Sequence, residues 1–347
     1  MVDREYCCSA FLAFRFIPVD GVEFAPGLSH VTASLPHPDR LTYVRDENDI
    51  DAALASAFDG LRCRRLGLLL SGGMDSAILA SYMKGCDAYT FRFMGGKFQR
   101  EELARAERFA ALNDMHLHYV DIDWSVAREC LPPVMRHRGA PVHSIEPQIF
   151  AAALQAAGDG VEHMVIGDGA DYVFGGMDLL LARDWGYEEY IKRYIYIDPF
   201  EALRDARDVT ALFEPYRRGD KIDFVAFMDG PNTVESYSSY MNAFAAAGMP
   251  YSDPYEHLKM AEPLDLGRIR SGESKYLIRA LFRKRYGEEP PQKVPMPRPV
   301  DEYFRDWKGP VRPEFREDLD IARYDGNRRW LLYALEQFLN MIDNETR

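Results

Sequence analysis

The chain has 347 residues, of which 47% are apolar and 28% charged, a composition that excludes a mainly disordered protein. Its net charge of −13 argues against non-specific nucleic-acid binding, because an acidic surface repels phosphates. The five cysteines form no CxxC pair, and neither a signal peptide nor an apolar run of about 18 residues is present, so we expect a cytoplasmic protein with reduced thiols and no membrane span.

Residues 1–60 are predicted to form an appendage of short strands and one helix. The apolar run over 6–17 predicts a strand, and 19–27 predicts turns followed by a weaker strand. Acidic residues at the start of 46–60, with a glycine at its end, predict a helix. The stretch is too short for a second enzyme domain, so we expect it to be attached to one domain over 61–347.

Strand and helix patterns alternate through the next hundred residues. Strands are predicted over 66–70, 88–93, 116–122 and 161–166, and helices over 77–83, 101–112 and 148–157. This alternation predicts an α/β fold with a doubly wound, mainly parallel sheet that binds ligands at the carboxyl ends of its strands. From about Leu179 onward helical patterns dominate, so we expect a helical C-terminal subdomain.

The loop Ser71–Ser76 (SGGMDS) lies between a buried apolar run, LGLLL, and a helical pattern. Its two glycines let backbone N–H groups approach an anion, and its two serine hydroxyls add hydrogen-bond donors. It is not a Walker A loop, because Gly-Lys-Ser/Thr is missing. Asp75 would repel a phosphate unless Mg²⁺ lies between them, so the loop predicts a magnesium–phosphate site. The alternative is a serine-capped turn.

A second polar loop, Gly167–Asp171 (GDGAD), follows another apolar strand. In a parallel sheet the two loops face one site, so Asp75 and Asp171 are candidates to share Mg²⁺. The alternative for Asp171 is a helix N-cap.

Basic residues gather between 259 and 298. Lys275, Arg279 and Arg283 recur every four residues, which places them on one helix face suited to ATP phosphates or, alternatively, to solvent. Lys293 lies in the proline-rich run PPQKVPMP, whose stiff backbone holds an ammonium in place.

These segments resemble, in order, motifs of the asparagine synthetase group of PP-loop ATP pyrophosphatases. The matching segments are SGGMDS, GDGADYVFGG, PYSD (250–253), KYLIR (275–279) and Gln292-Lys293. The resemblance implies that ATP and Mg²⁺ are the cofactors and that Asp75 and Asp171 bind the metal. The predicted nucleotide contacts are Leu69, Ser71, Gly72, Gly73, Asp75, Ser76, Phe93, Gly167 and Lys275.

Two predicted catalytic residues also follow from the resemblance. The lysine that matches Lys293 stabilises transition-state charge in the family. Asp168 stands where the family usually has glutamate, near the reacting intermediate, and can help to deprotonate the incoming amine. Tyr172 replaces a second family glutamate, and both departures put aspartate in doubt as the substrate.

The expected activity is adenylation of a carboxylate followed by amide formation, with release of AMP and pyrophosphate. The family's N-terminal glutaminase domain is missing, so the expected nucleophile is ammonia or a substrate amine. The expected partners are a small carboxylate and this nitrogen donor, and a separate glutaminase or an amine-carrying protein is a further candidate partner. Two alternatives stay open. One is a PP-loop tRNA-modifying enzyme, against which the acidic charge and the lack of CxxC count, and the other is an inactive binding protein of this fold.

Overall fold

A five-stranded parallel sheet forms the centre of the chain in this computed structural model, which describes residues 1–94, 99–292 and 298–345. In spatial order its strands are β4 (His116–Ile122), β3 (Asp87–Phe93), β2 (Leu66–Leu69), β5 (His163–Val165) and β8 (Tyr251–Ser252). Every neighbouring pair runs parallel, which confirms the predicted parallel α/β sheet.

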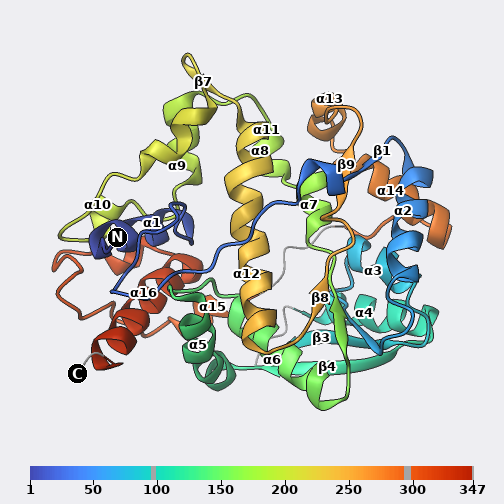
Figure 1. Cartoon of the computed structure of the whole chain (residues 1–347), viewed down its shortest axis with the longest axis horizontal. Helices are drawn as coiled ribbons and strands as arrows, with labels where there is room; N and C mark the ends of the chain where they lie inside the picture. The colour runs from blue at the N-terminus through green and yellow to red at the C-terminus, as the bar shows by residue number, and fades with distance from the viewer. Residues whose placement is uncertain (95–98, 293–297, 346–347) are drawn as a thin grey trace.

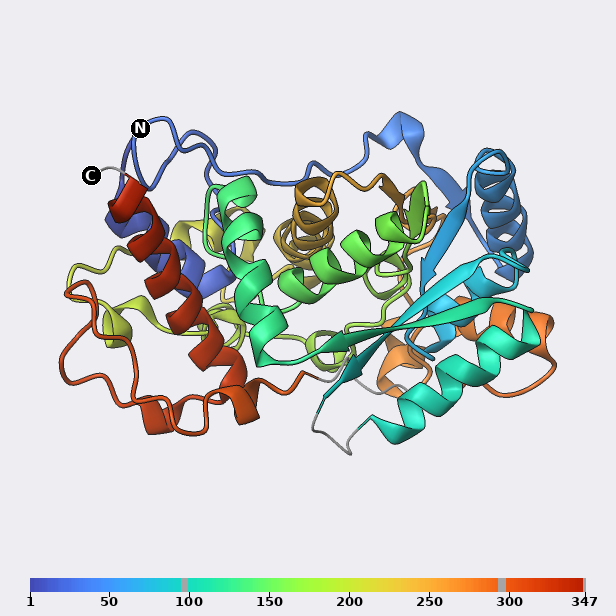
Figure 2. The same cartoon turned by 90° about the horizontal axis from the view of Figure 1, so that it is seen from below.

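Helices pack on both faces of this sheet (Figures 1 and 2). One group consists of α2 (Glu47–Asp59), α3 (Met74–Ala80), α4 (Arg100–Leu112) and α14 (Tyr276–Tyr286), and the other of α5 (Trp124–Arg138), α6 (Glu146–Gly158) and α12 (Thr233–Ala246). Successive strand residues point to opposite faces, so Ala88 joins the core of the first group and Tyr89 that of the second. The doubly wound arrangement is therefore confirmed.

The N-terminal segment is helix α1 (Arg4–Phe14), and the strand predicted over 6–17 is wrong. Asp3 caps the helix by accepting from the N–H of Tyr6 at 2.9 Å. Residues 7–14 are all buried, against α10 (Pro199–Ala202) and α16 (Gly326–Glu345) among others. A helix that is buried on every side has no polar face, so its apolar run cannot be told from a buried strand by periodicity. The weaker strand predicted nearby is reduced to a single bridge between Val2 and Glu23.

Helices dominate the described chain beyond residue 179, although the edge strand β8 of the central sheet also lies there. The remaining helices of the described chain are α7 (Gly169–Val173), α8 (Asp178–Leu181), α9 (Tyr187–Tyr194), α11 (Phe224–Phe227), α13 (Leu266–Arg270) and α15 (Val300–Tyr303), the 3-10 helices η1 (Pro38–Arg40), η2 (Thr210–Tyr216) and η4 (Ile321–Arg323), and the π-helix η3 (Met228–Asn232). Two small pairings join β1 (Thr42–Val44) to β9 (Leu258–Met260) and β6 (Arg217–Arg218) to β7 (Lys221–Ile222). Within the described ranges, no helix has both the length and the apolar character to cross a membrane.

Candidate active site

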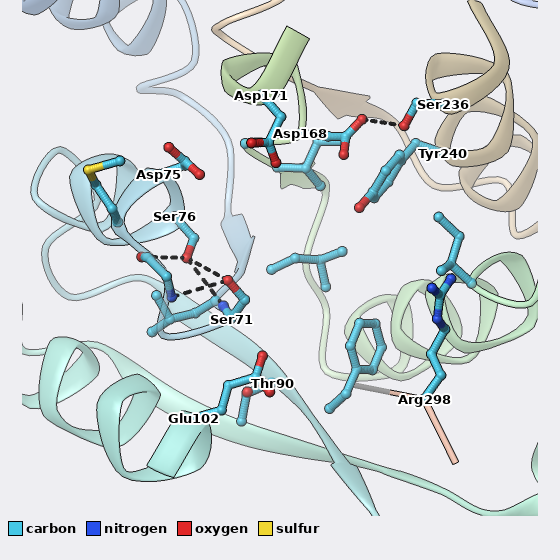
Figure 3. A pocket seen from close by; sticks show the side chains of 18 of the residues that line it. Ser71, Asp75, Ser76, Thr90, Glu102, Asp168, Asp171, Ser236, Tyr240 and Arg298 are labelled. Carbon is cyan, nitrogen blue, oxygen red and sulfur yellow. Dashed lines mark hydrogen bonds between the residues drawn. The ribbon is translucent and has the colours of Figure 1, made fainter. Parts of the chain in front are cut away.

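A cavity of about 360 Å³ opens at the carboxyl ends of β2, β3 and β5, where a parallel sheet is expected to bind its ligand (Figure 3). Most of the predicted site residues line it together: Leu69, Ser71, Gly73, Asp75, Ser76, Phe93, Gly167, Asp168, Asp171 and Lys275. Lys293 lies outside the described residues. The sequence therefore located one pocket correctly, although the role of each residue in it stays a prediction.

The first loop, Ser71–Ser76, is closed on itself by its two serines. The N–H of Ser71 donates to Oγ of Ser76 at 3.2 Å, and that hydroxyl donates to the carbonyl of Gly73 at 3.3 Å. Gly72 is not a lining residue: it has φ +73°, and an added Cβ would lie 2.6 Å from the carbonyl oxygen of Glu102 in α4. Glycine at this position lets the loop turn sharply and pack against α4, which fixes its shape.

A lysine joins the two predicted metal-binding aspartates. Nζ of Lys275 lies 2.6 Å from Oδ2 of Asp75 and 2.6 Å from Oδ1 of Asp171. Burial works against the charge on Lys275, but the two carboxylates outweigh burial and hold its pKa above the usual value. Lys275 has φ 52°, a left-handed conformation that is uncommon outside glycine, and it sits at the N-cap of α14. Gly176 closes the cluster from behind, where any side chain would collide with Asp171 and Lys275.

Asp75 and Asp171 offer the carboxylate oxygens that Mg²⁺ prefers. The point between them holds the ammonium of Lys275, 2.6 Å from each carboxylate, so a magnesium ion would bind on another side of the pair. Among the described residues, no group of three or more acidic, histidine or cysteine side chains is placed to hold a metal ion. Mg²⁺ commonly uses only one or two carboxylates and takes its other ligands from phosphates and water, so the pair is sufficient.

Asp168 lies beside this cluster and faces the pocket (Figure 3). Its Oδ2 accepts from the hydroxyl of Ser236 at 2.6 Å. Removal from water raises the pKa of Asp168 to about 7, and the nearby charges of Asp171 and Glu235 add to the rise. A carboxyl group with that pKa exchanges its proton near neutral pH, as a general base must.

Asp253 and Tyr255 hold the two loops in position. Oδ2 of Asp253 accepts from the N–H of Gly169 at 2.6 Å, and the Tyr255 hydroxyl donates to the carbonyl of Asp75 at 3.1 Å. The match of PYSD pointed to Asp253, but nothing in the sequence indicated Tyr255. Both supporting residues come shortly after β8, the edge strand that pairs with β5 although it is distant from β5 in sequence.

The basic face of α14 is divided between the pocket and the surface. Arg279 lines the pocket, and its Nε donates to the carbonyl of Ser274 at 2.8 Å. Arg283 instead forms an exposed ion pair with Glu289 at 2.8 Å. Arg283 therefore faces solvent, which is the alternative to phosphate binding that the sequence leaves open.

The end of the pocket away from the glycine loop was missed by the sequence analysis. Arg15 lies 2.7 Å from Oε2 of Glu235 and 2.9 Å from Nε2 of His143. Arg298 approaches the same imidazole nitrogen, at 3.1 Å, and the hydroxyl of Ser144 at 3.3 Å. These residues come from distant segments, and no local motif marks any of them.

Gln99 is a further lining residue without a sequence signal. Its side-chain oxygen accepts from the N–H of Phe93 at 2.7 Å, and its nitrogen donates to the carbonyl of Phe91 at 3.2 Å. The side-chain amide of Gln99 is thereby bonded to the backbone at the end of β3, close to the predicted adenine position.

Comparison with known proteins agrees with the motifs. A model of the asparagine synthase family matches residues 55–246, more than half of the chain. No curated protein matches the sequence. NMN synthetase from Francisella tularensis is similar in structure at 9% identity, covering 72% of this chain and 97% of its own, with a TM-score of 0.27. The U34-tRNA thiolase NcsA from Methanococcus maripaludis, solved with its [4Fe-4S] cluster, shares 13% identity over 67% of this chain and 75% of its own, with a TM-score of 0.25. Structural similarity at this level says nothing about function. The family match covers more than half of the sequence and shows that the chain belongs to the asparagine synthase family.

Proposed function

We propose that this chain activates a carboxylic acid with ATP and passes the acyl group to a nitrogen nucleophile, releasing AMP and pyrophosphate. One observation carries the proposal: Asp75 and Asp171, from two different loops, meet at Lys275 where the parallel strands end. Membership in the asparagine synthase family supports ATP-dependent activation in general. Paired carboxylates beside an anion-binding loop are suited to a magnesium nucleotide.

In this proposal the glycine loop and its neighbours bind ATP. Backbone N–H groups and serine hydroxyls of Ser71–Ser76 donate to phosphate oxygens, and the adenine lies near Leu69, Phe93 and Gly167. Mg²⁺, held by Asp75 and Asp171, supplies charge neutralisation to the triphosphate. Lys275, already placed between the carboxylates, contributes a positive charge to the same phosphates.

The first step joins the acid to the nucleotide. A carboxylate oxygen of the substrate attacks the α-phosphorus, and the bond from that phosphorus to pyrophosphate breaks. Negative charge grows on the α-phosphate as this happens. Lys293 is the proposed cation that stabilises it, because its proline-rich sequence predicts a stiff backbone and a charge positioned in advance needs no reorganisation during the step.

The second step forms the amide. The nitrogen attacks the acyl carbon, the bond from that carbon to AMP breaks, and one proton must leave the nitrogen. Asp168 is the proposed acceptor, since its pKa of about 7 leaves a substantial ionised fraction at neutral pH. Ser236 keeps the other carboxylate oxygen in place.

The nitrogen donor is proposed to be ammonia or a substrate amine, delivered free, by a separate glutaminase or on a carrier protein. Cys7 and Cys8 offer no glutaminase nucleophile, because both are buried in α1, and burial raises the pKa of the Cys7 thiol to about 12. A thiol in that state does not form the thiolate that attack on glutamine requires. Glutamine-dependent turnover by the pure chain would contradict this part of the proposal.

Carboxylate-dependent exchange of pyrophosphate into ATP, measured across a panel of acids, tests the proposal. We expect exchange that requires Mg²⁺ and is lost in Asp75→Ala together with magnesium-dependent ATP binding. The matched control is Asp178→Asn, an exposed acidic residue outside the pocket. Binding of ATP with no exchange for any acid would instead favour an inactive binding protein.

A further inference from the structure

Two arginines at the far end of the pocket belong to segments outside the family-matched residues 55–246. Arg15 follows α1, and Arg298 precedes α15. Both guanidinium groups contact Nε2 of His143, at 2.9 and 3.1 Å. In Figure 3, Arg298 lies across the pocket from Asp75 and Asp171, on the side of Tyr240.

The backbone of Arg15 indicates that its side chain is needed where it lies. Its φ of 66° is left-handed, and it occupies the C-cap of α1, donating its N–H to the carbonyl of Phe11 at 2.7 Å. Glycine is the usual residue in this conformation, because a Cβ is strained there. Here the strained arginine extends over the ring of Tyr196, 4.1 Å from its centroid, and reaches the pocket.

The charges at this end do not cancel within the described part of the chain. Glu235 neutralises Arg15 at 2.7 Å. His143 adds no negative charge, and burial together with the two arginines holds its pKa well below the usual value, so its ring is neutral. Arg298 has no carboxylate within ion-pair distance among the described residues, and its nearest polar partners are His143 and Ser144. A partly buried cation that lines a pocket without a counter-ion is suited to pair with an anion that enters the pocket.

We propose that Arg298, held in position by His143 and Ser144, binds a second anionic group of the acid substrate, a carboxylate or a phosphate, at the end remote from the carboxyl that is adenylated. The guanidinium fork matches either group with two parallel hydrogen bonds. This inference rests on the proposed function, and it narrows the substrate to acids that carry two anionic groups. The selecting residue lies on a segment that the family model does not cover.

Pyrophosphate exchange with matched acids tests the inference. Succinate, glutarate and adipate are each compared with the monocarboxylate of the same carbon count, and 3-phosphonopropionate supplies a phosphorus acid. We expect kcat/KM to favour at least one doubly anionic acid, and Arg298→Gln to reduce that preference by about tenfold to a hundredfold, the range for a charge-assisted hydrogen bond. Arg298→Lys keeps the charge but loses the fork, so it should retain part of the preference. Arg316→Gln, which breaks an exposed pair with Asp318, is the control.

The outcomes separate this inference from the proposed function. Exchange supported only by monocarboxylates would overturn the inference and leave the function standing, as would an equal loss for both kinds of acid in Arg298→Gln. If no acid supports exchange, calorimetry decides: binding of a dicarboxylate that is lost in Arg298→Gln supports the anion site, and absence of such binding overturns it. A third outcome is that inorganic phosphate binds in an Arg298-dependent way while no doubly anionic acid is preferred. The site would then bind a separate anion, and the proposal that it binds a group of the acid substrate would be wrong.

Discussion

The two ends of the pocket are built in different ways. The nucleotide end consists of two short loops, each directly after a strand, whose residues are neighbours in sequence as well as in space. The far end is assembled from Arg15, His143, Glu235 and Arg298, which meet only in the folded chain. Each end nevertheless depends on a basic residue with a left-handed backbone, Lys275 at one and Arg15 at the other.

The two ends therefore differ in how far their proposed functions can be recognised from local sequence. The proposed ATP site uses loops that follow directly from the strand order, so it is visible as motifs. The proposed choice of acid uses side chains from the outlying segments, so it could change without disturbing the loops. Substitutions at each end should therefore have separable effects.

The largest expected effect comes from Asp168→Asn, at the junction of the two ends. Loss of a general base typically costs about 10²–10⁴ in rate. We expect amide formation to slow by that order while pyrophosphate exchange persists, because the amine enters only in the second step. Asp178→Asn is the matched control. Equal loss of both steps would place Asp168 in acid activation instead.

The same residue predicts a pH dependence. Asp168 acts as a base only when ionised, so the amide step should fall about tenfold per unit below its pKa of about 7 and level off above it. In the folded protein its raised pKa favours the protonated form, so the stability it contributes is present below pH 3.8 and is lost as the pH rises toward 7. Asp168→Asn should remove both effects, as rate profiles and urea unfolding at several pH values will show.

Lys293→Ala should slow pyrophosphate release by about 10²–10³, the cost of losing one positioned transition-state charge. ATP binding and melting temperature should stay close to wild type, because Lys293 is proposed to stabilise charge that develops on the α-phosphate only during the reaction. Lys192→Ala, an exposed lysine of α9, is the control for loss of charge. Single-turnover rates close to wild type would show that Lys293 pairs only with solvent or a surface carboxylate.

Gly176→Ala tests the packing behind the nucleotide end. The new methyl group would displace Asp171 and Lys275, so we expect a loss of about 1–3 kcal/mol in unfolding free energy, as for other overpacked sites, and weaker magnesium-dependent ATP binding. Gly158→Ala places the same methyl group where nothing lies within 4 Å and should be neutral. If both variants bind ATP equally well, the cluster is less rigid than its contacts suggest.

The smallest effects are expected for two arginines of α14, one that lines the pocket and one at the surface. Arg279→Gln removes a pocket cation and should weaken ATP binding by about tenfold. Arg283→Gln breaks only an exposed pair with Glu289 and should change stability by less than about 1 kcal/mol. Titration calorimetry with both variants checks the contrast, and similar ATP affinities would contradict it.

Sequence reasoning located the nucleotide end because strand, loop and helix signals are local. It failed at α1, where burial on all sides removes the polar face that identifies a helix. It also missed α5, whose Pro132 and Pro133 normally end a helix but are tolerated here beside buried Leu131 and Val134. Arg15 and Arg298 left no signal because their meeting is set by tertiary packing alone.

The contact between α1 and α16 has a consequence for the order in which the protein is made. Arg4 pairs with Asp343, and the apolar residues of α1 pack against a helix that begins at Gly326. During synthesis α1 therefore leaves the ribosome long before α16 exists, and the part of its apolar surface that packs on α16 stays uncovered until almost the whole chain has emerged. The proposed anion site also waits for a late residue, Arg298, which is synthesised after Lys275, so the proposed nucleotide end is complete before the proposed acid-selecting end.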